Sequence, residues 1–380
     1  MAPWERASAG SSLAGVSEGH AAFMRCALAL AERGWGQTAP NPMVGAVLVR
    51  EGAILSEGWH ERFGGPHAET NALAAAGERA RGAHLYVTLE PCTHHGKTPP
   101  CTDAIIQAGV RAVSIAAPEP TRAAGGGADV LRRAGLEVQL GVEERRAREL
   151  NAAFYHSAAS DRPWVVLKLA VSADGAIAAP PGPDGRRGTR WLTGDAANAE
   201  VHRLRAAADA IAVGIGTVLA DDPRLTVRHF EAPRVQPARV VFDRRARTPI
   251  DSFLVSTARE TPAIIVVANE SLPAVQLLRG HGVEVIVAQE LPEALRLLRA
   301  RGIQSLLVEG GAGIAGALLS AGCVDRLLLI EAPVMLGDGA LDAFACVALR
   351  EVVLAAFELR EERRLGSDLL HVFALRESRV

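Results

Sequence analysis

The sequence predicts a chain of two α/β domains. Its 380 residues are 49% hydrophobic and 22% charged, so the chain is too long for one ordinary core and too apolar to be disordered. Short apolar strands alternate with helical patterns along its length, an order typical of layered α/β domains. Asp161-Arg162-Pro163 interrupts this alternation with turn-forming residues. We therefore expect a loose extension over residues 1–17, a first domain over 18–160 and a second over 161–380.

Elements of the first domain are predicted from their apolar periodicity. A helix begins at Glu18 and ends near Gly34, because glycine favours helix termination. The later elements alternate, with buried strands at 44–49, 84–89 and 112–116 and helices at 68–79, 102–108 and 142–158. This order predicts an α/β layered domain.

The second domain is richer in strands. Its first strand covers residues 164–171. Further strands alternate with helices such as 293–300 and 314–319, and are expected near 210–213, 240–242, 263–267, 283–287, 305–308 and 326–330. No internal repeat links the two halves of the sequence, so the second domain is not a copy of the first.

Charge and cysteine usage exclude several classes of protein. Lys and Arg number 41 and Asp and Glu 43, a formal net charge of −2, which argues against nonspecific nucleic-acid binding. Five cysteines are an odd number and too sparse for an extracellular disulfide framework, so a cytoplasmic location fits better. No apolar run approaches the roughly 20 residues of a membrane span. The sequence leaves the oligomeric state open, a homo-oligomer included.

The sharpest local signal is a group of metal-ligating and acid–base residues in the first domain. His67 and Glu69 are followed by Cys92 and Cys101. One imidazole and two thiolates suit Zn²⁺, and three protein ligands leave a fourth position for water, as in catalytic zinc sites. Zinc lowers the pKa of such a water, and Glu69 is placed to move the proton to a leaving amine. H-x-E followed by P-C and a second Cys is typical of zinc-dependent nucleobase deaminases.

The spacing of the two cysteines departs from that general signature. Eight residues separate Cys92 from Cys101, where the signature has two. The inserted segment is polar and loop-like, and we expect it to form one wall of a substrate pocket. A buried cysteine is otherwise an ordinary small apolar residue, and His94 and His95 are either part of a solvated loop or extra metal ligands. The three-ligand set is complete without these two histidines.

Three motifs of the first domain carry a resemblance to one enzyme family. These are Asn41-Pro42-Met43-Val44-Gly45, His67-Ala68-Glu69, and the run from Thr88 to Cys101 with its long loop. They are similar to the bifunctional pyrimidine deaminase/reductases of riboflavin biosynthesis. The resemblance implies a cytidine-deaminase-like α/β/α domain that removes the 2-amino group of a diaminopyrimidinone carrying phosphoribosylamine. It also implies that the zinc ligands are His67, Cys92 and Cys101.

The resemblance assigns two further residues to the substrate. It implies that Asn41 hydrogen-bonds the substrate and that Lys97 contacts its phosphate. Asn before Pro is also a common turn residue, and a loop lysine is often simply solvated. One departure concerns the same pocket, because Ala117-Pro118-Glu119-Pro120 stands where the family usually has Asp-Pro-Asn-Pro. The departure leaves the metal ligands intact and puts substrate affinity in question.

The second domain contains glycine-rich turns typical of nucleotide sites. Val213-Gly214-Ile215-Gly216-Thr217 follows one predicted strand, and Glu309-Gly310-Gly311-Ala312-Gly313 follows another and begins a helix. Such glycines let a pyrophosphate approach the backbone and the positive end of the helix. Arg244 follows the strand near 240–242, and a guanidinium there favours a 2′-phosphate, which argues for NADPH over NADH. A turn without a ligand and a surface arginine are the alternatives.

The same family resemblance extends through the second domain. It rests on Lys168 to Gly175, Trp191 to Gly194, Gly216 to Arg228 and Val308 to Gly311. It implies a dihydrofolate-reductase-like α/β domain that transfers hydride from NADPH to the ribosyl chain of the deaminated product. The residues implied to line the dinucleotide are Ala170, Trp191, Thr217, Asp221, Gly311, Ala312, Gly313, Ile314, Ala315, Gly316 and Ala317. Those implied to line the phosphosugar are Thr189, Arg205, Leu225, Arg228 and Glu309.

Several assignments in this domain stay open from the sequence. Lys168 lies in an apolar strand, where an unpaired ammonium is costly, so we expect either a substrate contact or a structural carboxylate partner. Arg205 and Arg228 suit a phosphate, but each is equally able to form a surface salt bridge. Asp221 and Asp222 can both be residues of the turn before Pro223, whereas the family resemblance implies that at least one of them lies at the reaction centre.

Two rival functions remain at this point. One is a reductase whose first domain keeps zinc but has lost deaminase activity. The other is a zinc deaminase that acts on nucleic acid, against which the charge balance and the second domain both argue. We expect a bifunctional enzyme acting on a small phosphoribosyl pyrimidine, with zinc and NADPH as cofactors and no nucleic-acid or membrane partner.

Overall fold

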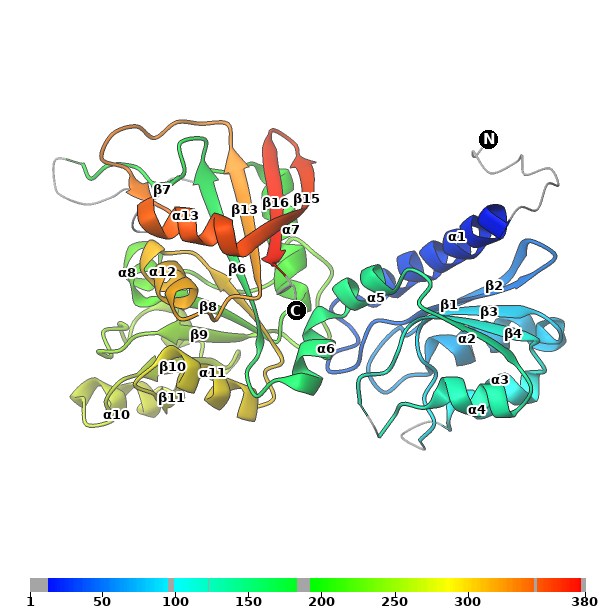
Figure 1. Cartoon of the computed structure of the whole chain (residues 1–380). Coiled ribbons are helices and arrows are strands. Elements are labelled where there is room, and N and C mark those ends of the chain that lie inside the picture. The colour runs from blue at the N-terminus through cyan, green and yellow to red at the C-terminus, as the bar shows by residue number, and fades with distance from the viewer. Residues whose placement is uncertain (1–12, 95–98, 122, 183–191, 345–346, 377–380) are drawn as a thin grey trace. The chain divides into compact units, whose positions relative to one another are not determined.

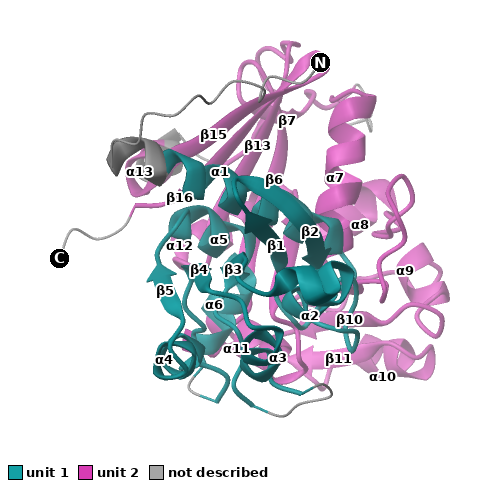
Figure 2. Ribbon diagram, turned by 90° about the vertical axis from the view of Figure 1, so that its right-hand side faces the viewer, with its two compact units in different colours: residues 1–158 teal, residues 159–380 magenta. Residues whose placement is uncertain are grey.

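The computed structural model describes residues 13–94, 99–121, 123–182, 192–344 and 347–376. The chain divides into two compact units, residues 1–158 and 159–380, which Figure 1 colours by residue number and Figure 2 by unit. Each unit has its own sheet and its own hydrophobic core. The predicted α/β class is confirmed for both. No helix within the described ranges is long and apolar enough to cross a membrane.

The sheet of the first unit has the strand order β2-β1-β3-β4-β5. Its strands are β1 Gly45–Arg50, β2 Ala53–Trp59, β3 His84–Leu89, β4 Ala112–Ala117 and β5 Glu137–Leu140. β1 runs antiparallel to β2 and β3, whereas β3, β4 and β5 are parallel. The sequence predicts only the three inner strands, because the edge strands β2 and β5 expose many of their residues and lack continuous apolar runs.

Helices cover both faces of this sheet, so the unit has three layers. One face is covered by α1 Leu13–Ala31 and α5 Glu144–Leu150, and the other by α2 Ala68–Ala76, α3 Cys101–Ala108 and α4 Gly127–Arg133. Alternate strand residues point to opposite faces: Val47 packs with α1, while Leu48 packs with α2. Two short 3-10 helices, Glu32–Gly34 and Gly77–Ala80, follow α1 and α2.

Two predicted helices have different bounds in the structure. α1 begins at Leu13, so residues 13–17 of the segment expected to be loose are helical, since Leu13 and Ala14 are good helix formers that extend the packed part. The helix expected over 142–158 is divided into α5 and α6 (Ala152–Ala159) at Asn151. The Asn151 side chain accepts a hydrogen bond from the Met43 N–H and donates one to the Met43 carbonyl, which ties the break to the start of β1.

The second unit is built on a nine-stranded sheet of order β11-β10-β9-β8-β12-β6-β13-β16-β15. Its strands are β6 Trp164–Ser172, β8 Ala210–Gly214, β9 Ala238–Phe242, β10 Ala263–Val267, β11 Glu284–Val287, β12 Ser305–Glu309, β13 Arg326–Ala332, β15 Phe357–Leu365 and β16 Asp368–Leu375. All neighbours from β11 to β13 are parallel, and β16 and β15 add an antiparallel hairpin at one edge. The sequence did not predict this hairpin, because β15 is mostly charged. A separate two-stranded sheet pairs β7 Ala176–Ala178 with β14 Leu341–Asp342.

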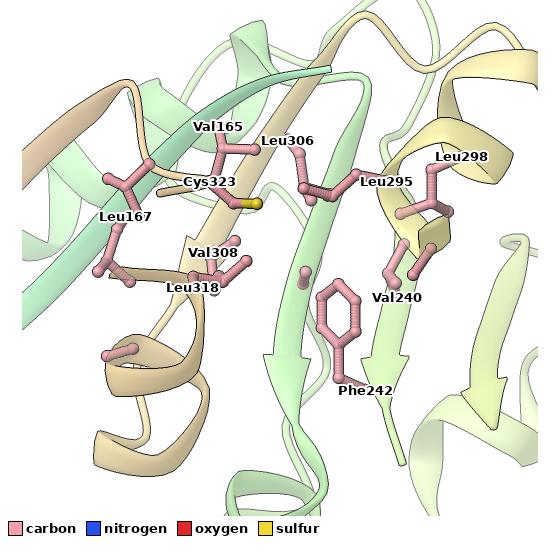
Figure 3. Packing of buried hydrophobic residues seen from close by; sticks show 14 of the residues in the cluster. Val165, Leu167, Val240, Phe242, Leu295, Leu298, Leu306, Val308, Leu318 and Cys323 are labelled. Atoms are coloured by element: carbon pink, nitrogen blue, oxygen red, sulfur yellow. The ribbon is translucent and has the colours of Figure 1, made fainter. Parts of the chain in front are cut away.

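The core of the second unit lies on both faces of the large sheet. One face is covered by α11 Leu291–Ala300, α12 Ala312–Ser320 and α13 Val347–Ala356. Figure 3 shows this side, where Leu318 of α12 lies close to Val308 of β12 and Leu295 of α11 lies close to Leu306. The other face is covered by α7 Asp195–Ala207, α8 Ile215–Asp221, α9 Phe253–Ser256 and α10 Pro273–Gly280. The carboxyl ends of β6, β8, β9 and β12 therefore meet at one edge, where ligands bind in open α/β sheets.

Two candidate active sites

Three side chains of the first unit converge at the N-termini of two helices. His67 precedes α2, Cys101 is the first residue of α3, and Cys92 lies just after β3. The His67 Nδ1 is 3.2 Å from the Cys101 Sγ and 3.6 Å from the Cys92 Sγ. The ligand atoms of all three residues lie within 4.8 Å of one another. One imidazole nitrogen and two sulfurs at this spacing fit a zinc ion.

The surroundings of Cys92 favour a thiolate, whereas the hydrogen bond with Cys92 and burial raise the pKa of Cys101. The positive ends of α2 and α3 both face the group, and the Cys101 backbone N–H donates a hydrogen bond to the Cys92 Sγ over 3.4 Å. Hydrogen bonding from the Cys101 side chain holds the pKa of Cys92 below its ordinary value. The donor set is therefore prepared for a soft divalent cation.

Glu69 lies in the first turn of α2, two residues after His67. Its side chain is 3% exposed, and burial raises the pKa of its carboxyl. Glu69, His67 and Cys92 line the same cavity of about 220 Å³. The helix thus places a carboxyl that is shielded from bulk water beside the three ligand side chains.

His60 is a residue of this cavity that the sequence reasoning missed. Its Nδ1 lies 3.0 Å from the Pro66 carbonyl oxygen, and its Nε2 lies 3.3 Å from the Asn41 Nδ2. A carbonyl only accepts, so Nδ1 carries the proton, Nε2 accepts from the Asn41 amide, and the Asn41 Oδ1 is left to face the cavity. The position of His60, seven residues before His67, could have suggested that it lies near the site. The hydrogen bond to Pro66 that fixes its ring could not be predicted from the sequence.

The segment after β4 contributes an acidic wall to the same cavity. Glu90 accepts hydrogen bonds from the backbone N–H groups of Glu119 and Ala128, and so shapes this segment. The Glu119 carboxylate lines the cavity and accepts from the N–H and hydroxyl of Thr121. The departure noted in the sequence, Ala117-Pro118-Glu119-Pro120, thus places a carboxylate at the cavity where the family usually has an amide. Of the long loop, His94 lines the cavity, while Lys97 and His95 fall outside the described residues.

A cavity of about 1060 Å³ lies at the carboxyl edge of the parallel strands in the second unit. Most of the residues expected at the dinucleotide and phosphosugar line it, namely Lys168, Ala170, Thr217, Asp221, Arg244, Glu309, Gly311, Ala312, Gly313, Ile314 and Ala317. Ala315 and Gly316 are buried in α12 and do not belong to this lining. Thr189 and Trp191 fall outside the part of the chain that the structure describes.

The turn from β12 to α12 has the backbone that a phosphate site requires. Gly310 and Gly311 have φ of +70° and +83°, the left-handed region that favours glycine. A Cβ on Gly311 would lie 3.2 Å from the Thr217 hydroxyl of α8. Glycine is therefore needed both for the turn and for the close approach of the two glycine-containing loops.

Three charged residues meet beside this cavity. Lys168 and Glu309 are paired in register on β6 and β12. Arg205 donates to both carboxylate oxygens of Glu309, over 2.5 and 2.7 Å. Burial lowers the pKa of Lys168, and the Glu309 charge opposes this effect. Burial alone would raise the pKa of Glu309, but the hydrogen bonds from Arg205 bring it below its ordinary value. Lys168 thus has the expected carboxylate neighbour, and that carboxylate also lines the cavity.

The other residues expected at the phosphosugar lie near this cluster but not on the cavity lining. Leu225 is buried, with a φ of +50°, and belongs to the core around α8. Arg228 is exposed, and its backbone N–H donates to the Nδ1 of buried His202 over 3.1 Å. His202 was not among the predicted site residues, because a histidine inside a helix carries no motif.

Two open assignments are clarified by the contacts. Asp222 accepts a hydrogen bond from the backbone N–H of Phe253, which makes it a cap for α9, whereas Asp221 lines the cavity. Arg244 lines the cavity together with Arg245 and Arg247, and donates to the Gln289 carbonyl. The three guanidinium groups lie just after β9, where a dinucleotide phosphate would be read.

Together, the two folds and sites define a zinc-type deaminase joined to a nucleotide-dependent reductase. Residues 17–117 match the model of the cytidine and deoxycytidylate deaminase zinc-binding region, and residues 163–371 match the RibD C-terminal domain. The chain belongs to the RibD family of bifunctional deaminase/reductases of riboflavin biosynthesis, whose cofactors are zinc and NADPH. The riboflavin biosynthesis protein RibD of Aquifex aeolicus is 40% identical over 356 residues, which cover 92% of this chain and 97% of that relative.

Other relatives support the same assignment. RibD of Escherichia coli is 38% identical over 371 residues, covering 92% of this chain and 98% of the relative. The solved structure of Acinetobacter baumannii RibD is 35% identical, with a TM-score of 0.81 over 95% of this chain and all of that chain. A Thermotoga maritima structure described as a diaminohydroxyphosphoribosylaminopyrimidine deaminase/5-amino-6-(5-phosphoribosylamino)uracil reductase has the same identity, TM-score and coverage. The family resemblance found in the sequence is thereby confirmed.

Proposed function

We propose that this chain deaminates a diaminopyrimidinone carrying phosphoribosylamine and then reduces the ribosyl chain of the product to a ribitylamino chain. A deaminase and a reductase acting on these two phosphoribosylamino pyrimidines are the activities by which the Thermotoga maritima structure is described. The observation that carries the proposal is the buried Glu69 carboxyl in one cavity with His67 and Cys92, beside Cys101. We assign the first reaction to residues 18–160 and the second to 161–380, with a cytoplasmic location and a small-molecule substrate.

In the deaminase site, His67, Cys92 and Cys101 would hold zinc, which when bound supplies the Lewis acidity that makes water a nucleophile near neutral pH. Glu69 takes up a proton at its carboxylate and delivers it to the departing amine. Asn41, oriented by His60, accepts a hydrogen bond from an N–H group of the pyrimidine through its Oδ1. Apolar residues of the cavity, such as Phe154, reduce the access of bulk water to the heterocycle.

In the reductase site, NADPH supplies a hydride when bound. The turn at Gly310 and Gly311, followed by α12, offers backbone N–H groups to its pyrophosphate, and Arg244 offers a guanidinium to its 2′-phosphate. Lys168 and Glu309 face the sugar that is reduced, and the ammonium of Lys168 can hydrogen-bond its oxygen. Arg205 acts through Glu309, which it holds by two hydrogen bonds.

The test is incubation of purified protein with the diaminopyrimidinone phosphoribosylamine, with and without NADPH, followed by mass analysis of products and measurement of ammonia. Without NADPH, the deaminated pyrimidine and ammonia should accumulate. With NADPH, the ribitylamino product should appear at the expense of cofactor absorbance at 340 nm. Absence of ammonia alongside reduction of added deaminated substrate would instead support a single-activity reductase, for which the Glu119 departure is the argument.

A further inference from the structure

One wall of the large cavity is formed by two segments that are far apart in the sequence. β7 and β14 pair antiparallel, with Leu341 opposite Ala178. The residues of this small sheet and its margin that line the cavity are all apolar: Ile177, Ala178, Ala179 and Leu341. The charged lining residues come from elsewhere, for example Lys168 and Arg244. This wall therefore suits a flat ring and offers no charged group to a phosphate.

Asp174, in the turn between β6 and β7, joins the two segments that form this wall. Its Oδ1 accepts from the backbone N–H of Leu336 over 3.1 Å, and its Oδ2 accepts from that of Gly337 over 2.8 Å. Both donors lie between β13 and β14. One carboxylate thus holds the start of β7 to the segment that leads into β14.

The neighbouring hydrogen bonds extend this connection. Ser172 donates its hydroxyl to the Asp174 Oδ1 over 2.5 Å and accepts from the Ala176 N–H over 3.0 Å. The Ala173 N–H donates to the Val334 carbonyl, and the Ala343 N–H donates to the Gly175 carbonyl. Ser172 and Asp174 therefore fix the backbone at the beginning of β7. The two backbone hydrogen bonds of Ala173 and Gly175, the neighbours of Asp174, also connect the two segments.

Part of the connection lies at the surface. Leu336 is half-buried, and Gly337 and Ala173 are exposed. Hydrogen bonds to an ionised acceptor are among the stronger ones, and here those from Ser172, Gly337 and Leu336 lower the pKa of Asp174 to about 2. Asp174 is therefore charged at any pH near neutrality, and its charge is used to fix the position of the wall.

We propose that Asp174 is a positioning residue for the reductase, which holds the β7–β14 wall in place against the flat nicotinamide ring of the bound dinucleotide. The role rests on the proposed reductase function. It is distinct from cofactor contact, because the carboxylate is directed at the backbone of Leu336 and Gly337. Without these bonds the two segments keep their backbone pairing and the packing of Ile177 and Phe344 on the core, but the turn before β7 is no longer tied to the segment before β14 by a carboxylate, and the wall samples positions in which it no longer packs on the ring.

The test compares Asp174→Asn with Asp338→Asn in the full-length protein. Asp338 is an exposed aspartate in the same segment, one residue after Gly337, and is the matched control for the loss of one charge. NADPH binding is titrated by cofactor fluorescence without substrate, and kcat and KM for NADPH are measured with the deaminated pyrimidine. We expect Asp174→Asn to raise the Kd and KM for NADPH about tenfold, the scale of a lost hydrogen bond to a charged group, with ammonia release unchanged. Asp174→Glu, which keeps the charge, should restore part of the affinity.

Three outcomes decide the proposal. A merely structural role predicts a lower Tm for Asp174→Asn with unchanged Kd and KM for NADPH, and that result would overturn the positioning role. An equal loss of affinity in Asp338→Asn would overturn it as well, because the effect would then be one of net charge. If Asp174→Asn does not fold, Ser172→Ala removes one bond of the same group and should raise the Kd by a smaller factor; no change in this variant overturns the proposal. Failure of the wild type to oxidise NADPH with the deaminated substrate would refute the proposed function instead.

Discussion

Glu69 is the side chain to which we assign proton transfer in the proposed deamination, since the three residues proposed to hold zinc can do so without it. We expect Glu69→Gln to lower the rate of ammonia release by about 10²–10⁴-fold, because an amide of the same shape cannot carry the proton. Zinc content, measured by elemental analysis, should stay at one ion per chain. Reduction of added deaminated substrate by NADPH should also be unchanged.

Matched variants make this result specific. His67→Ala and Cys92→Ser should lose zinc together with ammonia release, whereas Glu69→Gln should lose only the second. If Glu69→Gln retained the wild-type rate of ammonia release, another group would have to carry the proton. Glu119, whose carboxylate lines the same cavity, would then be the first residue to substitute.

His202 makes the stability of the second unit depend on pH. Burial, followed by the nearby charges of Arg205 and Arg228 and the neighbouring His229, lowers its pKa to about 4, and Glu309 opposes them. The unfolded value lies near 6.5, so the folded unit binds fewer protons between these values. The contribution to stability is complete above pH 6.5 and is lost as the pH falls towards 4.

This pH dependence is checked with His202→Gln, whose side-chain oxygen can still accept from the Arg228 N–H. Urea unfolding between pH 7.5 and 4.5 should show that the free energy of unfolding falls less steeply in His202→Gln than in the wild type. The exposed His281 provides the control, because His281→Gln should leave the slope as it is. Identical slopes for the wild type and His202→Gln would contradict the prediction.

At the scale of elements, the packing of α1 on the first sheet depends on one glycine. A Cβ built on Gly45 would lie 1.9 Å from the Ala27 carbonyl oxygen and 2.7 Å from the Ala31 nitrogen of α1. Backbone atoms of a helix cannot move aside singly, so Gly45→Ala must shift the helix from β1. We expect it to lower the free energy of unfolding by roughly 3 kcal/mol, as overpacking does in a tight core.

Gly19→Ala in the same helix is the control for this prediction. No atom lies within 4 Å of a Cβ at Gly19, so the added methyl should raise helix stability by up to about 1 kcal/mol. Urea unfolding should show a lower free energy of unfolding for Gly45→Ala and a higher one for Gly19→Ala. Equal effects of the two substitutions would show that the close approach of α1 and β1 is not what Gly45 provides.

The elements that the sequence predicts are those with a local signal. Strands buried on both faces, such as β3 and β12, are continuous apolar runs and were expected. The charged edge strand β15 was not, because its apolar residues do not alternate regularly and its pairing with β16 is tertiary. The division of α5 from α6 was missed for a similar reason, since the Asn151 side chain bonds to Met43, 108 residues away.

The site residues that could be predicted are likewise those that belong to a local sequence motif. The three residues predicted to bind zinc form a linear motif and lie in one cluster, and the glycine turn before α12 lies at the large cavity as expected. His60 was not predicted at the site, and Asp174 was part of a family motif without a role of its own, because each bonds to groups that only the fold brings near. Leu225, implied at the phosphosugar by resemblance, lies in the core around α8.

At the scale of the whole molecule, the two activities are expected to be separable within one chain. The three residues proposed to hold zinc and Glu69 belong to residues 1–158, and the described residues that line the large cavity all belong to residues 159–380. Each unit has its own sheet and core, so the loss of metal from one does not remove any contact from the other's cavity.

Removal of zinc by a chelator should therefore abolish ammonia release and leave the NADPH-dependent reduction of added deaminated substrate at its original kcat and KM. Added zinc should restore deamination, because the ligand atoms are held within 4.8 Å by the starts of α2 and α3. Chelator-treated Asp174→Asn is a reference for a reductase defect that is independent of zinc. Its KM for NADPH should be raised whether or not zinc is present. If chelation of the wild type lowered the reductase kcat in parallel with ammonia release, the second site would depend on the metal-loaded first unit, and the two activities would have to be treated as one coupled centre.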